Sequence, residues 1–188
     1  SVQTFTITVN PIPVVTPVAN ATFCNGTNTS LIAINGTGTS YAWTNSTTSI
    51  GLGASGSGNI PPFAATNIGS TPVNATIGII PSFTNAGVTC AGLNSNATIT
   101  INPTPTVNNV NSQVICNNSS TAAITYSGTG NSYTWANNTP SIGLANAGTG
   151  NIASFVGLNA SNNAASIATL TVTPQYLNNG VNCSGNTT

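Results

Sequence analysis

The sequence predicts an all-β protein made of two tandem β-sandwich domains. First, apolar and polar residues alternate along several short segments, for example between Val73 and Ile79, which is typical of a strand with one buried face. Second, no segment keeps apolar residues at helical spacing, and Asn, Thr, Gly and Pro, which are poor helix formers, dominate. Third, the second half of the chain repeats the first. The 188 residues are therefore expected to form two copies of one strand-rich domain.

The repeat is visible as a set of landmarks at a nearly constant offset. The matched pairs are Cys24 and Cys116, Tyr41 and Tyr133, Trp43 and Trp135 at an offset of 92, and Pro81 and Pro174, Cys90 and Cys183 at an offset of 93. A single residue inserted in a loop accounts for the change of offset. A period of this length is too long for a solenoid coil and suits an independent sandwich domain.

The repeat boundaries are out of phase with the chain. Residues 4–11 match the segment that ends at Pro103 and closes the first repeat. Residues 1–10 are therefore expected to be the last strand of a preceding repeat or a donor strand, with Phe5, Ile7 and Val9 as its apolar residues. The first repeat then covers residues 11–102, and the second covers residues 103–188 and lacks its final strand.

The expected strands of the first repeat follow from the alternation and from turn residues. They lie near residues 14–23, 31–34, 40–44, 60–65, 73–80 and 97–101. Turns are expected at Asn25-Gly26, at Asn35-Gly36 and in the glycine-rich stretch 53–58. The aromatic pairs Tyr41 and Trp43, Tyr133 and Trp135 are expected to anchor the two cores, because large aromatic side chains dominate burial.

The composition excludes most kinds of chemistry. The chain has no Lys, Arg, Asp, Glu or His, and 30 Asn, 32 Thr and 20 Ser residues supply the polar surface. Without a carboxylate or an imidazole there is no ordinary general acid or base and no hard-oxygen metal cage, so we expect no enzyme, no cofactor and no metal site. Without Lys or Arg, nucleic acid and anionic membrane surfaces are excluded as partners. No apolar run approaches the roughly 20 residues that span a bilayer, so direct membrane insertion is not expected.

The four cysteines, Cys24, Cys90, Cys116 and Cys183, indicate disulfides. They have no His or acidic co-ligands and no close Cys-x-x-Cys spacing, which argues against zinc or redox chemistry and places the chain outside the reducing cytosol. The default pairing lies within each repeat, Cys24 with Cys90 and Cys116 with Cys183. The alternative joins Cys24 to Cys183 across neighbouring repeats and leaves Cys90 and Cys116 for repeats beyond this chain. Spacing alone leaves these two pairings and the remaining connectivity open.

An ordered set of motifs resembles a known family. The motifs are Asn-Pro-x-Pro at Asn10 and Asn102, Cys-Asn-Gly at Cys24, Tyr-x-Trp-Thr-Asn at Tyr41, Ser-Ile-Gly-Leu at Ser49, Gly-Asn-Ile at Gly58 and Asn-x-Gly-Val-x-Cys at Asn85. Together they resemble the PKD-like, immunoglobulin-like repeats of very long cell-surface proteins of Bacteroidota, including gliding-associated adhesins. The resemblance implies two tandem immunoglobulin-like (PKD-like) β-sandwich domains, export by type IX secretion and a role in a stalk or adhesin. Trp43-Thr44-Asn45 replaces the Trp-Asp-Phe-Gly-Asp pattern of PKD domains proper, so the looser, PKD-like group is the one that matches.

These observations predict a secreted structural protein at the bacterial surface. The chain is expected to be a disulfide-stabilised spacer of an extracellular filament, stalk or adhesin, and its partners are neighbouring copies or repeats of the same protein. Neighbours assemble by strand complementation, or the chain is two links cut from a longer covalent array. The alternative is an adhesive module whose loops bind a glycan or another surface.

Overall fold

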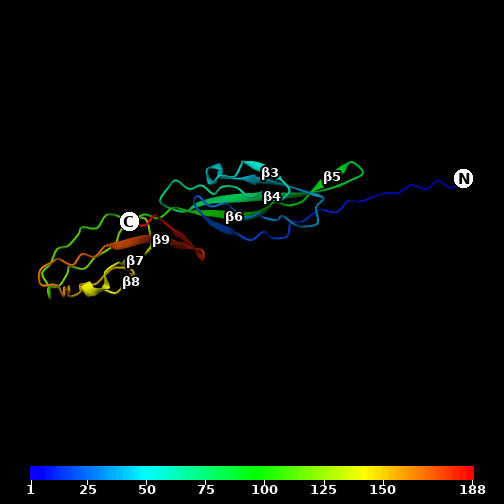
Figure 1. Ribbon diagram of the computed structural model, residues 1–188. Coiled ribbons are helices and arrows are strands. Elements are labelled where there is room, and N and C mark those ends of the chain that lie inside the picture. The colour runs from blue at the N-terminus through cyan, green and yellow to red at the C-terminus, as the bar shows by residue number, and fades with distance from the viewer. The chain divides into compact units, whose positions relative to one another are not determined.

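The computed structural model describes residues 1–188, which divide into two compact units (Figure 1). The first unit contains Ser1–Asn67 and Pro72–Ile101, and the second contains Ile68–Thr71 and Asn102–Thr188. Strands make up 37% of the chain and there is no α-helix, which confirms the all-β prediction. The helical turns are two short 3-10 segments, η1 (Thr48–Ile50) and η2 (Pro140–Ile142).

The first unit is organised around one sheet. Its strands are β1 (Ala21–Cys24), β2 (Ser40–Asn45), β3 (Ser55–Ser57), β4 (Val73–Asn85), β5 (Val88–Ala91) and β6 (Ser95–Asn102). The order across the sheet is β1-β6-β4-β2-β3. The long strand β4 pairs antiparallel with β2, pairs through its first half with β6 and turns back at its end into β5 (Figure 1).

A second layer of extended chain faces this sheet. It is joined by isolated bridges, Val15 to Gly36, Asn28 to Ala64 and Ile32 to Ile60, rather than by regular strands. The buried side chains come from both layers: Ile34, Trp43, Ile50, Leu52, Ile60, Ala65, Ala75, Ile77, Ile79, Ile99 and Ile101. A core between a sheet and an opposing extended layer is consistent with a β-sandwich.

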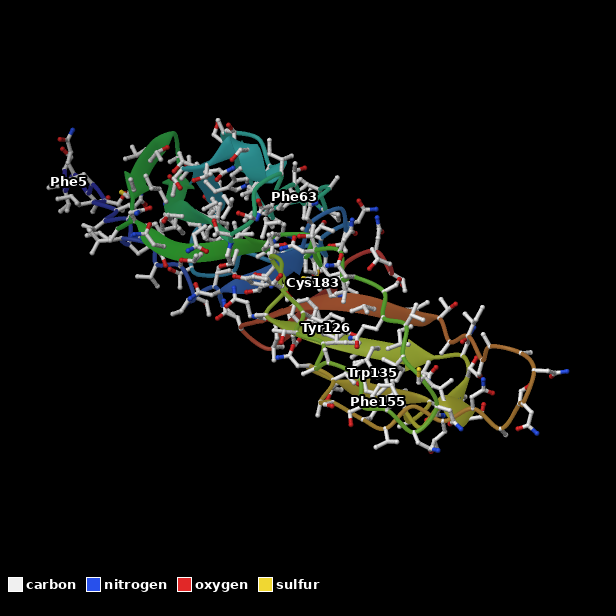
Figure 2. All side chains as sticks on the ribbon, turned by 90° about the vertical axis from the view of Figure 1, so that its left-hand side faces the viewer. Phe5, Phe63, Tyr126, Trp135, Phe155 and Cys183 are labelled. Carbon is white, nitrogen blue, oxygen red and sulfur yellow. The ribbon has the colours of Figure 1, made fainter.

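The second unit has the same plan with fewer strands. Its strands are β7 (Ser132–Asn137), β8 (Ala147–Thr149), β9 (Leu170–Asn178) and β10 (Val181–Ser184), in the order β10-β9-β7-β8. The core cluster is Tyr126, Trp135, Leu144, Ile152 and Val172, with Phe155 packed against it (Figure 2). Counterparts of β1 and β6 are missing from the second unit.

One predicted turn and four predicted strands need correction. The stretch 53–58 contains β3, and β4 continues to Asn85 and forms a hairpin with β5, which was not predicted. The predicted strand at residues 14–23 is regular only from Ala21 onward, because Pro13 and Pro17 lack the N–H that a ladder needs. Residues 31–34 and 60–65 are extended, with bridges in place of a strand.

Candidate functional site

The N-terminal segment has an apolar face with nothing packed on it. Phe5, Ile7 and Val9 are 86%, 79% and 86% exposed, and none of residues 1–10 belongs to a strand. Figure 1 shows this segment in blue, running away from the sheet of the first unit. Since three large apolar side chains at alternating positions are costly to leave in water, the segment has the form of a strand without a sheet.

Strand β6 occupies the matching position of the repeat in the first unit. It lies between β1 and β4, and its inward residues Ala97, Ile99 and Ile101 are at most 5% exposed. Ala97 pairs with Ile77 and Ile99 with Ala75 of β4, both of which are fully buried. An offset of 92 places Phe5, Ile7 and Val9 on these three inward positions. The N-terminal segment therefore carries the apolar face of a β6 strand.

In the second unit the position of β6 is filled only at its first residue. Thr188 exchanges two backbone hydrogen bonds with Val172, of 2.8 and 3.0 Å, and this pair corresponds to Ser95 and Ile79 of the first unit. Strand β9 begins at Leu170, whereas β4 begins at Val73, four residues earlier in the repeat. Ile167, just before β9, is 79% exposed. The edge of β9 that corresponds to the β6-paired edge of β4 is thus shorter and pairs only at Val172.

The counterpart of β1 is also unformed. In the first unit β1 pairs with β6, and Phe23 packs against the core. Residues 113–116 of the second unit are not a strand, and Val114 is 99% exposed. Residues 102–188 therefore contain no counterpart of the β1–β6 pair of the first unit.

The junction between a β6-type strand and the repeat that follows it has one asparagine–asparagine hydrogen bond in common in the two units. Before the first repeat, Asn10 accepts a hydrogen bond from the side-chain amide of Asn85 at 3.0 Å and donates one to the carbonyl of Val88 at 3.3 Å. At the end of β6, the side chain of Asn102 accepts a hydrogen bond from Asn178 at 2.8 Å. Asn85 and Asn178 both lie at the tip of the cysteine-bearing hairpin, β4–β5 or β9–β10.

The cysteines do not pair within each repeat. A disulfide joins Cys24 to Cys183, and Cys90 and Cys116 are free thiols. The default pairing of Cys24 with Cys90 and of Cys116 with Cys183 is therefore wrong for this structure, and the pairing across repeats is the one observed. Cys183, labelled in Figure 2, is buried, whereas Cys90 is half-buried and Cys116 is exposed.

The predicted aromatic anchors lie in or beside the two cores. Trp43 and Trp135 are 5% and 9% exposed, and Tyr41 and Tyr133 are partly buried against the same clusters. The indole N–H of each Trp has no hydrogen-bond partner. Each ring lies over the glycine that pairs with it across the sheet, Gly56 in β3 or Gly148 in β8, where a Cβ atom would clash with the ring.

A buried asparagine in each unit was missed by the sequence analysis. The amide of Asn45, at the end of β2, donates to the carbonyl of Leu52 at 2.9 Å and to those of Thr47 and Gly53 at 3.3 Å, and its oxygen accepts from Thr47 N–H at 3.0 Å. Asn137 makes the same contacts in the second unit. Its repetition two residues after each Trp was the available signal. These amides tie down the loop that contains each 3-10 turn.

The structure was also compared with what a metal site, a membrane span and a ligand pocket require. There is no group of three or more His, Cys, Asp or Glu side chains that could hold a metal ion. No helix has the length and hydrophobicity to cross a membrane. A shallow hollow of about 340 Å³ on the first unit is lined by residues 16–21 and by side chains that include Leu31 and Asn35.

Comparison with known proteins leaves the family resemblance as an expectation. No protein-family model matches the chain, and no curated protein is similar enough to count as a relative.

Proposed function

We propose that this chain is a structural repeat of an extracellular bacterial fibre, stalk or surface adhesin, in which each two-repeat segment acts as a disulfide-stabilised spacer. The observation that carries the proposal is the correspondence between the N-terminal segment and β6. Within residues 1–188 the position beside β9 is filled only by Thr188, and Phe5, Ile7 and Val9 are the residues that the repeat places there.

Strand complementation links neighbouring repeats in this proposal. Residues 3–10 of one copy occupy the β6 position of the second unit of another, add backbone hydrogen bonds along β9 and bury three apolar side chains. Burial of these side chains contributes about 1.5–3 kcal/mol each before the cost of ordering the segment. The added strand also lets residues 113–116 pair with it as β1 pairs with β6. Binding of one strand therefore forms two strands in the second unit.

The composition supports an extracellular structural role. A surface without charges has no long-range repulsion to hold neighbouring fibres apart, and its hydration rests on Asn, Thr and Ser. The observed disulfide suits an oxidising compartment. Immunoglobulin-like or PKD-like identity, export and cell-surface attachment remain part of the proposal.

Deletion of residues 1–10 tests the assembly step. The full chain is expected to form multimers in light scattering, and the deleted chain is expected to stay monomeric. A synthetic peptide of residues 1–10 should raise the melting temperature of the deleted chain. A peptide with Phe5→Ser, Ile7→Ser and Val9→Ser should not, and one with Thr4→Ser, Thr6→Ser and Thr8→Ser, which keeps the apolar face, serves as the matched control. Unchanged assembly after deletion would contradict strand complementation.

The mass of the native polypeptide distinguishes two forms of the fibre. A reduced mass near 18.6 kDa corresponds to separate copies joined by strand exchange. A mass many times larger corresponds to a covalent array, in which the same strand joins consecutive repeats of one chain.

A glycan- or surface-binding module is the second candidate. The hollow on the first unit offers amide side chains, among them Asn20 and Asn35, beside apolar ones, a combination that suits a neutral sugar. Reproducible binding of the chain to a defined glycan on an array, lost in Asn35→Ala, would favour this function over a spacer.

A further inference from the structure

We infer that Cys116 of one copy forms a disulfide with Cys90 of the next copy, so that every junction along the fibre carries the same covalent staple. The inference rests on the proposed strand complementation and names the bond that would lock it. It follows from three observations: the observed disulfide, the positions of the two free thiols in the repeat, and the repeated asparagine junction.

The two free cysteines occupy the same positions in the repeat as the two disulfide-bonded cysteines. Cys116 stands at the position of Cys24, and Cys90 stands at the position of Cys183. The observed bond joins the first-position cysteine of one repeat to the second-position cysteine of the following repeat. Applied to the second repeat of this chain, the same rule pairs Cys116 with the second-position cysteine of whatever repeat follows. In a fibre of identical copies, that residue is Cys90 of the next copy.

Strand complementation brings these two thiols to the same junction. In this chain β6 completes the first unit and leads directly into the repeat that carries Cys183. In the fibre, residues 3–10 of the next copy complete the second unit and lead directly into the repeat that carries Cys90. The order of strand, junction and cysteine is therefore identical in the two cases.

The junction itself has matching local structure. Asn102, at the end of β6, is held by Asn178 of the β9–β10 hairpin, in which Cys183 pairs with Tyr176. Asn10, at the end of the N-terminal segment, is held by Asn85 of the β4–β5 hairpin, in which Cys90 pairs with Phe83. The asparagine after the N-terminal segment thus contacts the hairpin of Cys90 in the way that Asn102 contacts the hairpin of Cys183.

Exposure of the free thiols fits a bond that has yet to form. Cys116 is exposed in a segment that is not a strand, whereas Cys24, its image, ends β1. Cys90 is half-buried and accessible at the hairpin, whereas the bonded Cys183 is 3% exposed. Adding the strand would order residues 113–116 as β1 and fix Cys116 at its end.

The chemistry is an ordinary two-electron oxidation. Each thiol loses one proton, the two sulfur atoms together lose two electrons, and the sulfur–sulfur bond forms between Cys116 and Cys90. A small-molecule or protein disulfide is the oxidant: its own sulfur–sulfur bond breaks, and it takes up both electrons and both protons to become two thiols. Attack requires a thiolate, and Cys116 is exposed, so an oxidant can reach its sulfur.

The test is a non-reducing denaturing gel of the full chain after incubation with oxidised glutathione. The wild type should give a ladder at multiples of 18.6 kDa that collapses to one band on reduction. Cys116→Ser and Cys90→Ser should each stay monomeric when alone. Mixed together, these two variants should give dimers and nothing larger, because each keeps only one of the two thiols. Mass spectrometry of the dimer should find Cys116 of one variant bonded to Cys90 of the other.

Several outcomes would overturn the inference. Disulfide-linked dimers of either single variant alone would indicate pairing of like cysteines, and a Cys90–Cys116 bond within a monomer would indicate closure inside one chain. A wild type that assembles in light scattering but gives no ladder would refute the staple and leave the proposed function intact. A wild type that neither assembles nor forms a ladder would refute both. The variant Phe5→Ser, Ile7→Ser, Val9→Ser keeps both thiols, and a full ladder from it would show that the bond does not depend on strand complementation.

Discussion

The buried amide of Asn45 allows a prediction that separates hydrogen bonding from charge. Its nitrogen faces three carbonyl oxygens, the closest being that of Leu52 at 2.9 Å, and its oxygen accepts from the N–H of Thr47 at 3.0 Å. The side chain is 8% exposed. Asn45→Ala removes about three net hydrogen bonds of about 1 kcal/mol each and leaves their partners buried, so we expect a loss of about 3 kcal/mol in the free energy of unfolding.

Asn45→Asp should lower the free energy of unfolding more than Asn45→Ala does at neutral pH. A carboxylate would keep the acceptor for Thr47 but would place a negative charge against the carbonyl oxygens and away from water, for an expected loss of about 4 kcal/mol. These surroundings disfavour the charged form, so the pKa of the new carboxyl should be raised in the folded state. The stability of this variant should therefore recover as the pH falls through that pKa, because the protonated acid can donate one hydrogen bond.

Urea unfolding followed by circular dichroism and tryptophan fluorescence, at neutral pH and at about pH 4, measures both effects. Asn94→Asp is the matched control: Asn94 is exposed and donates to the side chain of Asn96, so the same charge should cost little there. Asn137→Asp should reproduce the Asn45 result in the second unit. Equal unfolding midpoints for Asn45→Asp and Asn94→Asp at neutral pH would refute the reasoning, as would a loss that does not shrink at the lower pH.

Three further predictions follow from packing and composition. Gly56→Ala should lower the free energy of unfolding by about 1–3 kcal/mol, because the added Cβ would clash with the ring of Trp43. Gly148→Ala should have the same effect in the second unit. Thermal unfolding measures both, with Gly53→Ala as the control because Gly53 has open space around it. Burial raises the pKa of Tyr126 above its ordinary value of 10.0. The free energy of unfolding should therefore be unaffected by this residue below about pH 10 and should fall above it, because the unfolded tyrosine ionises first. A pH titration in which the free energy of unfolding of Tyr126→Phe falls as steeply as that of the wild type would exclude this cause. Because the chain has no charged side chain, its melting temperature at neutral pH should change by no more than about 1 °C between roughly 0.05 and 1 M NaCl, measured by calorimetry.

The fold class and the longer strands could be predicted because apolar and polar side chains alternate along these strands. The alternation from Val73 to Ile79 matches the buried and exposed faces of β4, and the Trp-containing segments are β2 and β7. Strand β3 could not be predicted in this way, because Ser55-Gly56-Ser57 has no β-branched or aromatic residue. It pairs with β2 because a glycine leaves room for the Trp43 ring, which is a property of the partner strand.

The candidate site was predictable in one part and not in the other. The alternation of Phe5, Ile7 and Val9 indicates a strand, but a strand needs a neighbour for its hydrogen bonds, and no neighbour pairs with this segment within the chain. The disulfide could not be chosen from spacing, because four cysteines allow three connectivities. The observed pair joins cysteines of different repeats, and loop lengths do not specify which repeats are joined.

The outer strands of both sheets are all short. β1, β5 and β10 have four residues each, and β3 and β8 have three. Many β-proteins protect such edges from aggregation with lysine or another charge, which this chain lacks entirely. Short outer strands are another protection against unwanted sheet-to-sheet growth. In the proposed fibre, short outer strands would let many copies lie close together while backbone pairing stays restricted to the edge of β9.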